Sequence, residues 1–136
     1  MIKFLLHLRP KRIPAEALHF KKTFGLGGIL TYLFILEVVS GILLMFYYTP
    51  SIDQAFFDIK KITNVIPYGY FLRSIHRLSG ELMIIIGFLH MLRIVIQKSY
   101  DTKVRVKNWI YGVLLFLLIF PLNFTGYLLP FDTISY

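Results

Sequence analysis

Three apolar runs, each long enough to cross a lipid bilayer, constrain this chain more than any other feature of its sequence. They cover residues 24–48, 75–97 and 109–129. The first run has Glu37 as its only charged residue in 25 positions, and the third has no charge in 21. A helix of about 20 apolar residues spans the ~30 Å hydrocarbon core and satisfies its own backbone hydrogen bonds there. The sequence therefore predicts an all-α membrane protein with three transmembrane helices.

The composition supports a membrane location and narrows the chemistry of the chain. Of the 136 residues, 57% are hydrophobic and the mean hydropathy is +0.67, which is too apolar for a small soluble domain. The net charge of +8 comes from basic residues that flank the apolar runs. Anionic lipid headgroups, and not nucleic acid, are therefore their expected neighbours. The absence of cysteine excludes disulfides, thiolate-bound iron–sulfur clusters and thioether-linked haem within the chain.

The basic residues also predict how the helices are oriented. Six precede the first run, in a segment over residues 1–23, three lie between the first two runs, and four lie between the second and third. By the positive-inside rule, the N-terminal segment and the second loop face the cytoplasm. We therefore expect a multi-pass integral protein of a prokaryotic cytoplasmic membrane, with one transmembrane domain over residues 24–136. The N-terminal segment lacks the features of a signal peptide, so we expect it to be retained.

Two histidines, His76 and His90, lie near the two ends of the second run. Their separation of fourteen residues is close to four helical turns, so both imidazoles project from nearly the same face, roughly 21 Å apart. This arrangement places one histidine in each membrane leaflet. An imidazole inside a membrane can be a metal ligand, a proton relay or a hydrogen-bonding group between helices. The histidine pair alone does not distinguish these roles.

Glycines in the other two runs repeat the same interval. Gly27 and Gly41 are fourteen residues apart in the first run, and so are Gly112 and Gly126 in the third. A flat macrocycle between helices needs a nitrogen ligand for its metal and a residue without a side chain where the ring meets a neighbouring backbone. Two stacked haems need each of these twice. The alternative is that the glycines serve close packing between the helices.

Arginines accompany both histidines. Arg73 precedes His76 by three residues and Arg93 follows His90 by three, so each histidine has a cation one turn nearer its own membrane surface. Haem propionates are anions that need such partners at the membrane edge. The alternative is that both side chains extend to lipid headgroups.

A resemblance to a known family is carried by three stretches: FGLGGI, GYFLRSIHRLSGELMIIIGFLHMLR and FTGYLLPFD. Together they resemble the N-terminal part of cytochrome b from quinol-oxidising bc and photosynthetic bf complexes, over about residues 19–136. The paired histidines, both glycine pairs and the GYLLP motif are jointly specific for that family. The LGGI motif and the short first loop are more similar to the bf-type protein than to the mitochondrial one.

The resemblance implies a fold and a set of ligands. It implies that the three helices form part of a haem-binding four-helix bundle with two b-type haems. It implies that His76 is an axial ligand of the outer, lower-potential haem and His90 of the inner, higher-potential one. It further implies that Arg73 and Arg93 meet propionates, and that the end of the third helix borders the outer quinol site.

The chain departs from the family pattern at two positions. In bf-type proteins, a cysteine before the LGG motif holds an additional haem, whereas this chain has Gly25 there. A covalently attached third haem is therefore not expected. The usual tryptophan after LLP is replaced by Phe131, which keeps an aromatic ring but has no indole donor.

The number of histidines predicts a partner. Two hexacoordinate haems need four axial ligands, and His7 and His19 lie in the basic N-terminal segment, away from an outer haem. Either a companion chain supplies the missing ligands on a second histidine-pair helix, or two copies of this chain pair their histidines. We favour the companion, because the family has such a helix after the region that this sequence covers.

These patterns predict an electron-transfer subunit that carries electrons across the membrane within a quinol-oxidising complex, and that catalyses nothing alone. Expected partners are quinol, an iron–sulfur or cytochrome redox subunit, membrane lipid and a second copy of the assembled complex. One rival is a haem b anchor subunit of a hydrogenase or formate dehydrogenase. Another is a haem-free transporter subunit that uses Glu37, Glu81 and the histidines as a proton relay. The sequence leaves open whether Glu37 forms a hydrogen bond in the bundle or lies on a proton route.

Overall fold

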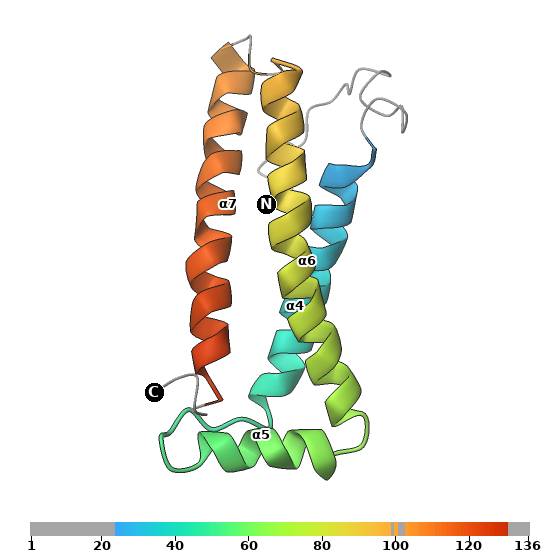
Figure 1. Cartoon of the computed structure of the whole chain (residues 1–136), viewed down its shortest axis with the longest axis vertical. Coiled ribbons are helices and arrows are strands. Elements are labelled where there is room, and N and C mark those ends of the chain that lie inside the picture. Colours follow the sequence, from blue (N-terminus) through green and yellow to red (C-terminus); the bar gives the residue numbers. More distant parts are fainter. Residues whose placement is uncertain (1–23, 99, 101–102, 131–136) are drawn as a thin grey trace, which may run out of the picture.

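The computed structural model describes residues 24–98, 100 and 103–130, and of residues 103 and 104 it describes the backbone only. These residues form four helices and no strand: α4 (Leu26–Met45), α5 (Ala55–Asn64), α6 (Gly69–Ile96) and α7 (Lys103–Leu128). Helices α4, α6 and α7 run lengthwise, and α5 lies across one end of them (Figure 1). The predicted all-α class is confirmed. The basic N-terminal segment with His7 and His19, and also Phe131, lie outside the described residues.

Three of these helices are long and apolar enough to cross a membrane, over Leu26–Met45, Gly69–Ile96 and Arg105–Leu128. Large apolar side chains point outward along them; for example, Phe34 of α4 is 58% exposed and Leu115 of α7 is 64% exposed. Such surfaces are stable against lipid or another apolar helix, not against water. The prediction of three transmembrane helices is confirmed.

Two helices begin earlier than their apolar runs, whereas α4 begins two residues later than its run and ends three residues earlier. Helix α6 begins at Gly69, six residues before the predicted start, and α7 begins at Lys103, six residues before Trp109. Hydropathy marks only the part of a helix that lies in hydrocarbon, whereas the backbone hydrogen bonds continue until a turn interrupts them. For α6 that interruption is Pro67, followed by Tyr68 with a positive φ of 60°.

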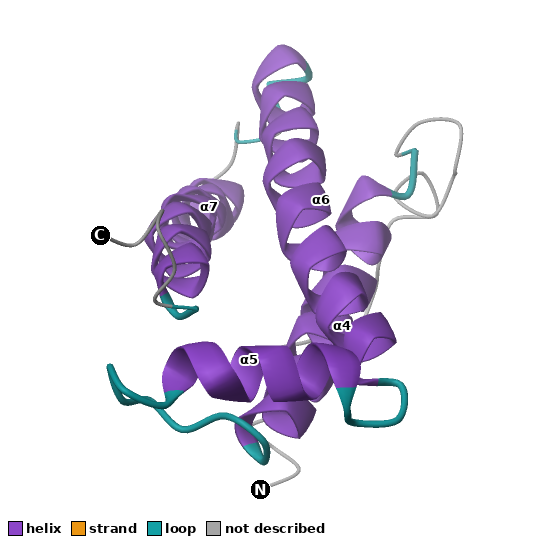
Figure 2. Cartoon of the chain, turned by 60° about the horizontal axis from the view of Figure 1, so that its bottom comes forward, coloured by secondary structure: helices purple, strands orange, loops and turns teal. Residues whose placement is uncertain are grey.

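Helix α6 is the central element, because it packs against each of the other three helices. Figure 2 shows it between α4 and α7. Two of its glycines allow the close approach. A Cβ atom at Gly80 would lie 3.2 Å from Glu37 Oε1 of α4 and 3.3 Å from Asn123 Nδ2 of α7, and one at Gly87 would lie 3.0 Å from the Phe116 ring. Small residues of this kind let membrane helices pack at short backbone distance.

Helix α5 is too short and polar for an analysis based on long apolar runs to find. Its inward face is formed by Ala55 and Ile62, which are fully or almost fully buried, while Phe57 is 68% exposed. The Lys60 ammonium lies 4.6 Å from the centre of the Phe56 ring. This amphipathic pattern, with its mixed polar and aromatic outer face, is typical of a helix that lies in the plane of the membrane surface.

Two hydrogen bonds connect separate parts of the chain at the α5 end of the bundle. The Tyr48 hydroxyl donates to the Leu129 carbonyl oxygen at 2.7 Å, and the Thr49 amide donates to Asp58 Oδ2 at 2.9 Å. Burial, and to a smaller extent the Asp58 carboxylate, raise the pKa of Tyr48. The phenol therefore stays protonated at physiological pH and remains a hydrogen-bond donor.

The junction between α5 and α6 leads to a stability prediction. A Cβ atom at Gly69 would lie only 2.0 Å from the Ile62 carbonyl oxygen, whereas one at Gly28 would meet no atom within 4 Å. We expect Gly69→Ala to destabilise the protein by about 1–3 kcal/mol, because backbone must move to accommodate the methyl group. Gly28→Ala, the matched control, is expected to leave the thermal unfolding midpoint in detergent nearly unchanged. Equal midpoints for the two variants would contradict this account of the junction.

Candidate functional site

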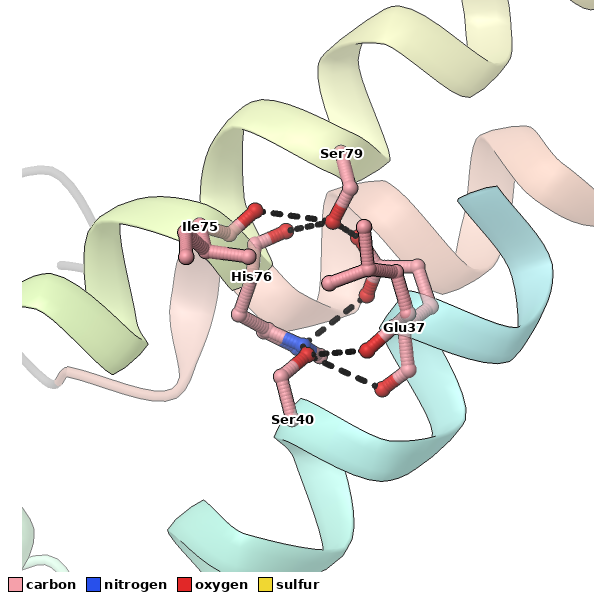
Figure 3. Close-up of polar contacts among 6 residues, drawn as sticks. Glu37, Ser40, Ile75, His76 and Ser79 are labelled. Carbon is pink, nitrogen blue, oxygen red and sulfur yellow. Dashed lines mark hydrogen bonds and ion pairs between the residues drawn. The ribbon is translucent and has the colours of Figure 1, made fainter. Parts of the chain in front are cut away.

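A cluster of polar side chains surrounds His76 where α4 and α6 meet. The His76 Nδ1 atom lies 2.9 Å from Glu37 Oε2 and 2.8 Å from Ser40 Oγ (Figure 3). Glu37 and Ser40 are three residues apart on α4, so both face α6 on one side of the helix. Ser40 is 2% exposed. The imidazole is therefore held by two groups of the neighbouring helix at the same nitrogen.

The hydrogen-bond partners assign the proton on the His76 ring. The single proton of the Ser40 hydroxyl is used in its bond to the Leu36 carbonyl oxygen at 2.6 Å. Nδ1 must then carry the ring proton and donate it to Glu37 Oε2 and Ser40 Oγ. Nε2 is left with its lone pair, and no hydrogen bond involves it within the described part of the chain. This is the tautomer of a metal-ligating histidine whose other nitrogen is fixed by a carboxylate.

The carboxylate of Glu37 is itself fixed from the side of α6. Ser79 Oγ donates to Glu37 Oε1 at 2.6 Å, and Ser79 is 3% exposed. Glu37 therefore bridges two residues, His76 and Ser79, that lie three apart on α6, and its own side chain is 19% exposed. Buried charge is tolerated in a membrane protein where it is paired and hydrogen-bonded in this way. Of the two roles left open for Glu37, the structure shows hydrogen bonding within the bundle.

The second histidine has different surroundings. The His90 ring lies against Gly27 of α4, and its Nδ1 atom is buried without a hydrogen-bond partner among the described residues. A buried polar atom without a partner is costly and rare in native proteins. The nitrogen therefore has capacity for a group that is not part of this chain's described region.

The glycine pair of α4 lies opposite the histidine pair of α6. A Cβ atom at Gly41 would lie 3.2 Å from His76 Cε1, and one at Gly27 would lie 3.5 Å from His90 Cε1. A side chain at Gly41 would thus press on the His76 ring, and one at Gly27 would reach the His90 ring. The equal spacing in sequence becomes two equivalent layers in space, one toward each end of the bundle.

The glycine pair of α7 does not contact either histidine. A Cβ atom at Gly112 would lie 3.9 Å from Met91 Sδ, and one at Gly126 would meet no atom within 4 Å. The structure thus brings together the α4 glycines and the histidines, but not the α7 glycines. Packing between helices does not account for Gly126, since nothing in the described residues crowds it.

Arg73 and Arg93 each donate a hydrogen bond to a neighbouring polar side chain. Arg73 Nη1 donates to Thr63 Oγ1 of α5 at 3.2 Å, and Arg93 Nη2 donates to Gln97 Oε1 at 2.9 Å. Arg73 thus lies toward the α5 end of the bundle from His76, and Arg93 lies toward the opposite end from His90. This matches the predicted position of a cation beyond each histidine.

A second polar cluster joins α6 to α7. Glu81 Oε1 accepts hydrogen bonds from Arg77 Nε at 3.0 Å and from the Tyr127 hydroxyl at 2.5 Å. The Arg77 guanidinium also lies 5.5 Å from the centre of the Tyr127 ring. Glu81 therefore forms an ion pair with Arg77 within α6 and a hydrogen bond with Tyr127 of α7. It does not contact His76 or Glu37 in any described interaction.

Sequence analysis identified both histidines but missed Ser40 and Ser79. The available signal was a matching pair of spacings: Glu37 and Ser40 on one apolar helix, and His76 and Ser79 on the other, each three residues apart. Polar residues at this spacing share a helix face, and such faces in a membrane are expected to meet each other.

The observed geometry fits a haem at each histidine. The described residues contain no group of three or more His, Asp or Glu side chains that could hold a metal ion. A metal at either histidine would therefore need ligands from outside these residues, as a porphyrin provides for iron. An available Nε2 on His76 and a glycine opposite each ring agree with this chemistry.

A family model described as "Cytochrome b/b6/petB" matches residues 13–136. This chain belongs to the cytochrome b/b6 family. The cytochrome b6 of Heliomicrobium gestii is 42% identical to it over 113 residues, which cover 83% of this chain and 53% of that protein. The menaquinol:cytochrome c reductase cytochrome b subunit of Bacillus subtilis is 40% identical over 106 residues, which cover 78% of this chain and 47% of that subunit.

The fold agrees with this family. A chain in a solved structure described as "Hyperthermophilic respiratory Complex III" superposes on this cytochrome b-family chain with a TM-score of 0.79 and 31% identity. The match covers 84% of this chain and 29% of the other. This cytochrome b-family chain thus spans about half the length of its curated relatives, or less.

Family membership and three membrane-spanning helices together establish a multi-pass integral membrane protein of an electron-transfer family. The resemblance to cytochrome b is confirmed. The match favours a cytochrome b of the bc or b6 type over a hydrogenase-type haem b anchor and over a haem-free transporter subunit.

The contact between Ser79 and Glu37 leads to a prediction about helix association. Ser79→Ala removes a donor to the partly buried Glu37 carboxylate and should destabilise the α4–α6 pair by about 1 kcal/mol or more. Ser74→Ala is the matched control, because Ser74 lies on an exposed face of the same helix. The measurement is thermal unfolding of both variants in the same detergent. A Ser79→Ala variant as stable as Ser74→Ala would contradict the assigned bond.

Proposed function

We propose that this chain is an electron-transfer subunit that binds two b-type haems within a quinol-oxidising complex of the bc or bf type. His76 and His90 each provide one axial nitrogen ligand. Haem b, when bound, supplies reversible one-electron chemistry at its iron. The chain itself contributes the positions of the ligands, the shape of the surrounding helices and the local charge.

The observation that carries this proposal is the register between α4 and α6. Gly41 lies opposite His76 and Gly27 lies opposite His90, with the same fourteen-residue interval on both helices. Helix packing alone requires close contacts but does not require that they coincide with two imidazoles at one repeat. A planar group ligated at each ring requires both conditions at once. Gly112 and Gly126 of α7 are proposed to border the same two groups from the other side.

The second axial ligand of each haem is proposed to come from outside residues 24–130. The described residues contain only two histidines, His76 and His90, and a six-coordinate haem needs two axial ligands. We favour a further helix with two histidines about four turns apart, on a companion polypeptide or elsewhere in cytochrome b, which completes a four-helix bundle. Pairing of two copies of this chain across a symmetry axis is the alternative.

The arginines are proposed to meet the haem propionates. A guanidinium has five N–H groups, and Arg73 uses one Nη1 contact toward Thr63. Arg73 and Arg93 lie near opposite ends of α6, where a haem ligated one turn away would direct its anionic groups. Binding there would orient each ring and offset the cost of burying its charge.

Orientation and partners complete the proposal. The positive charges favour a cytoplasmic N-terminus, which places His76, α5 and the end of α7 on the outer side of a prokaryotic cytoplasmic membrane. The end of α7 is proposed to border the site of quinol oxidation. An iron–sulfur or cytochrome subunit is proposed to receive or supply electrons, in a complex that forms a dimer. Support comes from relatives named as cytochrome b6 and as a menaquinol:cytochrome c reductase subunit.

The ligand assignment predicts two separable losses. In the assembled complex, His76→Leu should remove mainly the outer haem and His90→Leu mainly the inner one, since the two rings lie in different layers. Reduced-minus-oxidised optical spectra, combined with a redox titration, measure each haem separately. Each variant is the matched control for the other, because both lose one imidazole from the same helix. Full occupancy of both haems in either variant, or an unmodified complex without a haem α-band, would overturn the proposal.

A further inference from the structure

We infer that Glu37 is a positioning residue that fixes the His76 imidazole and lowers the midpoint potential of the haem ligated there. This inference rests on the proposed function, because it assumes iron at His76. It concerns a residue of α4 that does not itself contact the haem iron. Its effect is transmitted through the hydrogen bond from Nδ1.

The contacts of Glu37 leave its carboxylate little freedom to turn away. Oε2 accepts the Nδ1 proton of His76 at 2.9 Å, and Oε1 accepts a hydrogen bond from Ser79 at 2.6 Å (Figure 3). The Ser79 oxygen also lies 2.8 Å from the Ile75 carbonyl oxygen, so its single proton is shared between that oxygen and Glu37 Oε1. Oε2 thus accepts a hydrogen bond from the His76 imidazole, and Oε1 accepts one from Ser79, which lies about one turn further along α6. Rotation of the carboxylate would break two bonds in a region with few alternative partners.

The predicted effect on the haem follows from charge and from ligand basicity. A carboxylate that accepts the Nδ1 proton raises the electron density of the imidazole, which strengthens its bond to ferric iron. The negative charge also lies one ring away from the metal in a medium of low dielectric constant, where it favours the more positive oxidation state. Both effects stabilise the oxidised haem relative to the reduced haem, so both lower its midpoint potential.

The surroundings of His90 differ from those of His76. The His90 Nδ1 atom has no hydrogen-bond partner among the described residues. Arg73 and Arg93 each lie three residues from a histidine on α6, so the arginines do not distinguish the two sites. The difference is the Glu37 carboxylate, which contacts Nδ1 of His76. We expect this carboxylate to lower the potential at His76 relative to a site without one.

The test is a spectroelectrochemical titration of the assembled complex that carries Glu37→Gln. Glutamine keeps the size of the side chain and an oxygen that accepts the Nδ1 proton, but it removes the charge. Glu81→Gln is the matched control, because it removes a like charge from the same bundle at a residue bonded to Arg77 and Tyr127. We expect the midpoint potential of the His76 haem to rise in Glu37→Gln by more than in Glu81→Gln, with little change at the His90 haem.

An unchanged His76 haem potential in Glu37→Gln, or equal shifts in the two variants, would overturn the inference while leaving the proposed function intact. Absence of haem from the unmodified complex would instead overturn the proposed function. If Glu37→Gln retains too little haem for titration, Glu37→Asp decides the question. The shorter side chain keeps the charge but withdraws it from Nδ1, so a smaller upward shift is expected, and an unchanged potential in Glu37→Asp would overturn the inference.

Discussion

The register between α4 and α6 determines which groups of the two helices meet. With both helices at this register, Gly27 and Gly41 lie opposite His90 and His76, and the carboxylate of Glu37 reaches Nδ1. A displacement of one helix by a single residue would rotate these groups by about 100° away from each other. The polar contacts therefore select one register among the many that apolar side chains alone would tolerate.

Polar groups inside this bundle are concentrated at helix junctions. Ser40, Ser79 and Glu37 join α4 to α6 around His76, while Arg77, Glu81 and Tyr127 join α6 to α7. In hydrocarbon, an unpaired polar group is costly, so each cluster strengthens the helix contact that satisfies it. The outer faces of the spanning helices carry many exposed apolar side chains, which suit contact with lipid or with another apolar helix. Helix α5 closes one end and carries Thr63, the partner of Arg73.

The sequence predicted much of this arrangement, because the relevant signals are local. Run length identified three spanning helices, and equal fourteen-residue intervals identified both histidines and the α4 glycines that lie opposite them. The start of α6 was misplaced since it depends on a turn at Pro67 and Tyr68 and not on hydropathy. The contacts of Glu37 with His76 and Ser79 could not be predicted, because they depend on the distance and rotation between two helices. The position of Gly112 and Gly126 relative to the histidines depends on the tilt of α7 in the same way.

Helices α4 and α6 form two layers, each built from one histidine and one glycine, and we propose that each layer holds a haem. An experimental structure of the assembled complex would decide this. We expect two haem irons, bound to Nε2 of His76 and His90, with the ring edges against Gly41 and Gly27. Irons bound by other residues of this chain, or side chains in place of a haem in either layer, would show that the proposal is wrong.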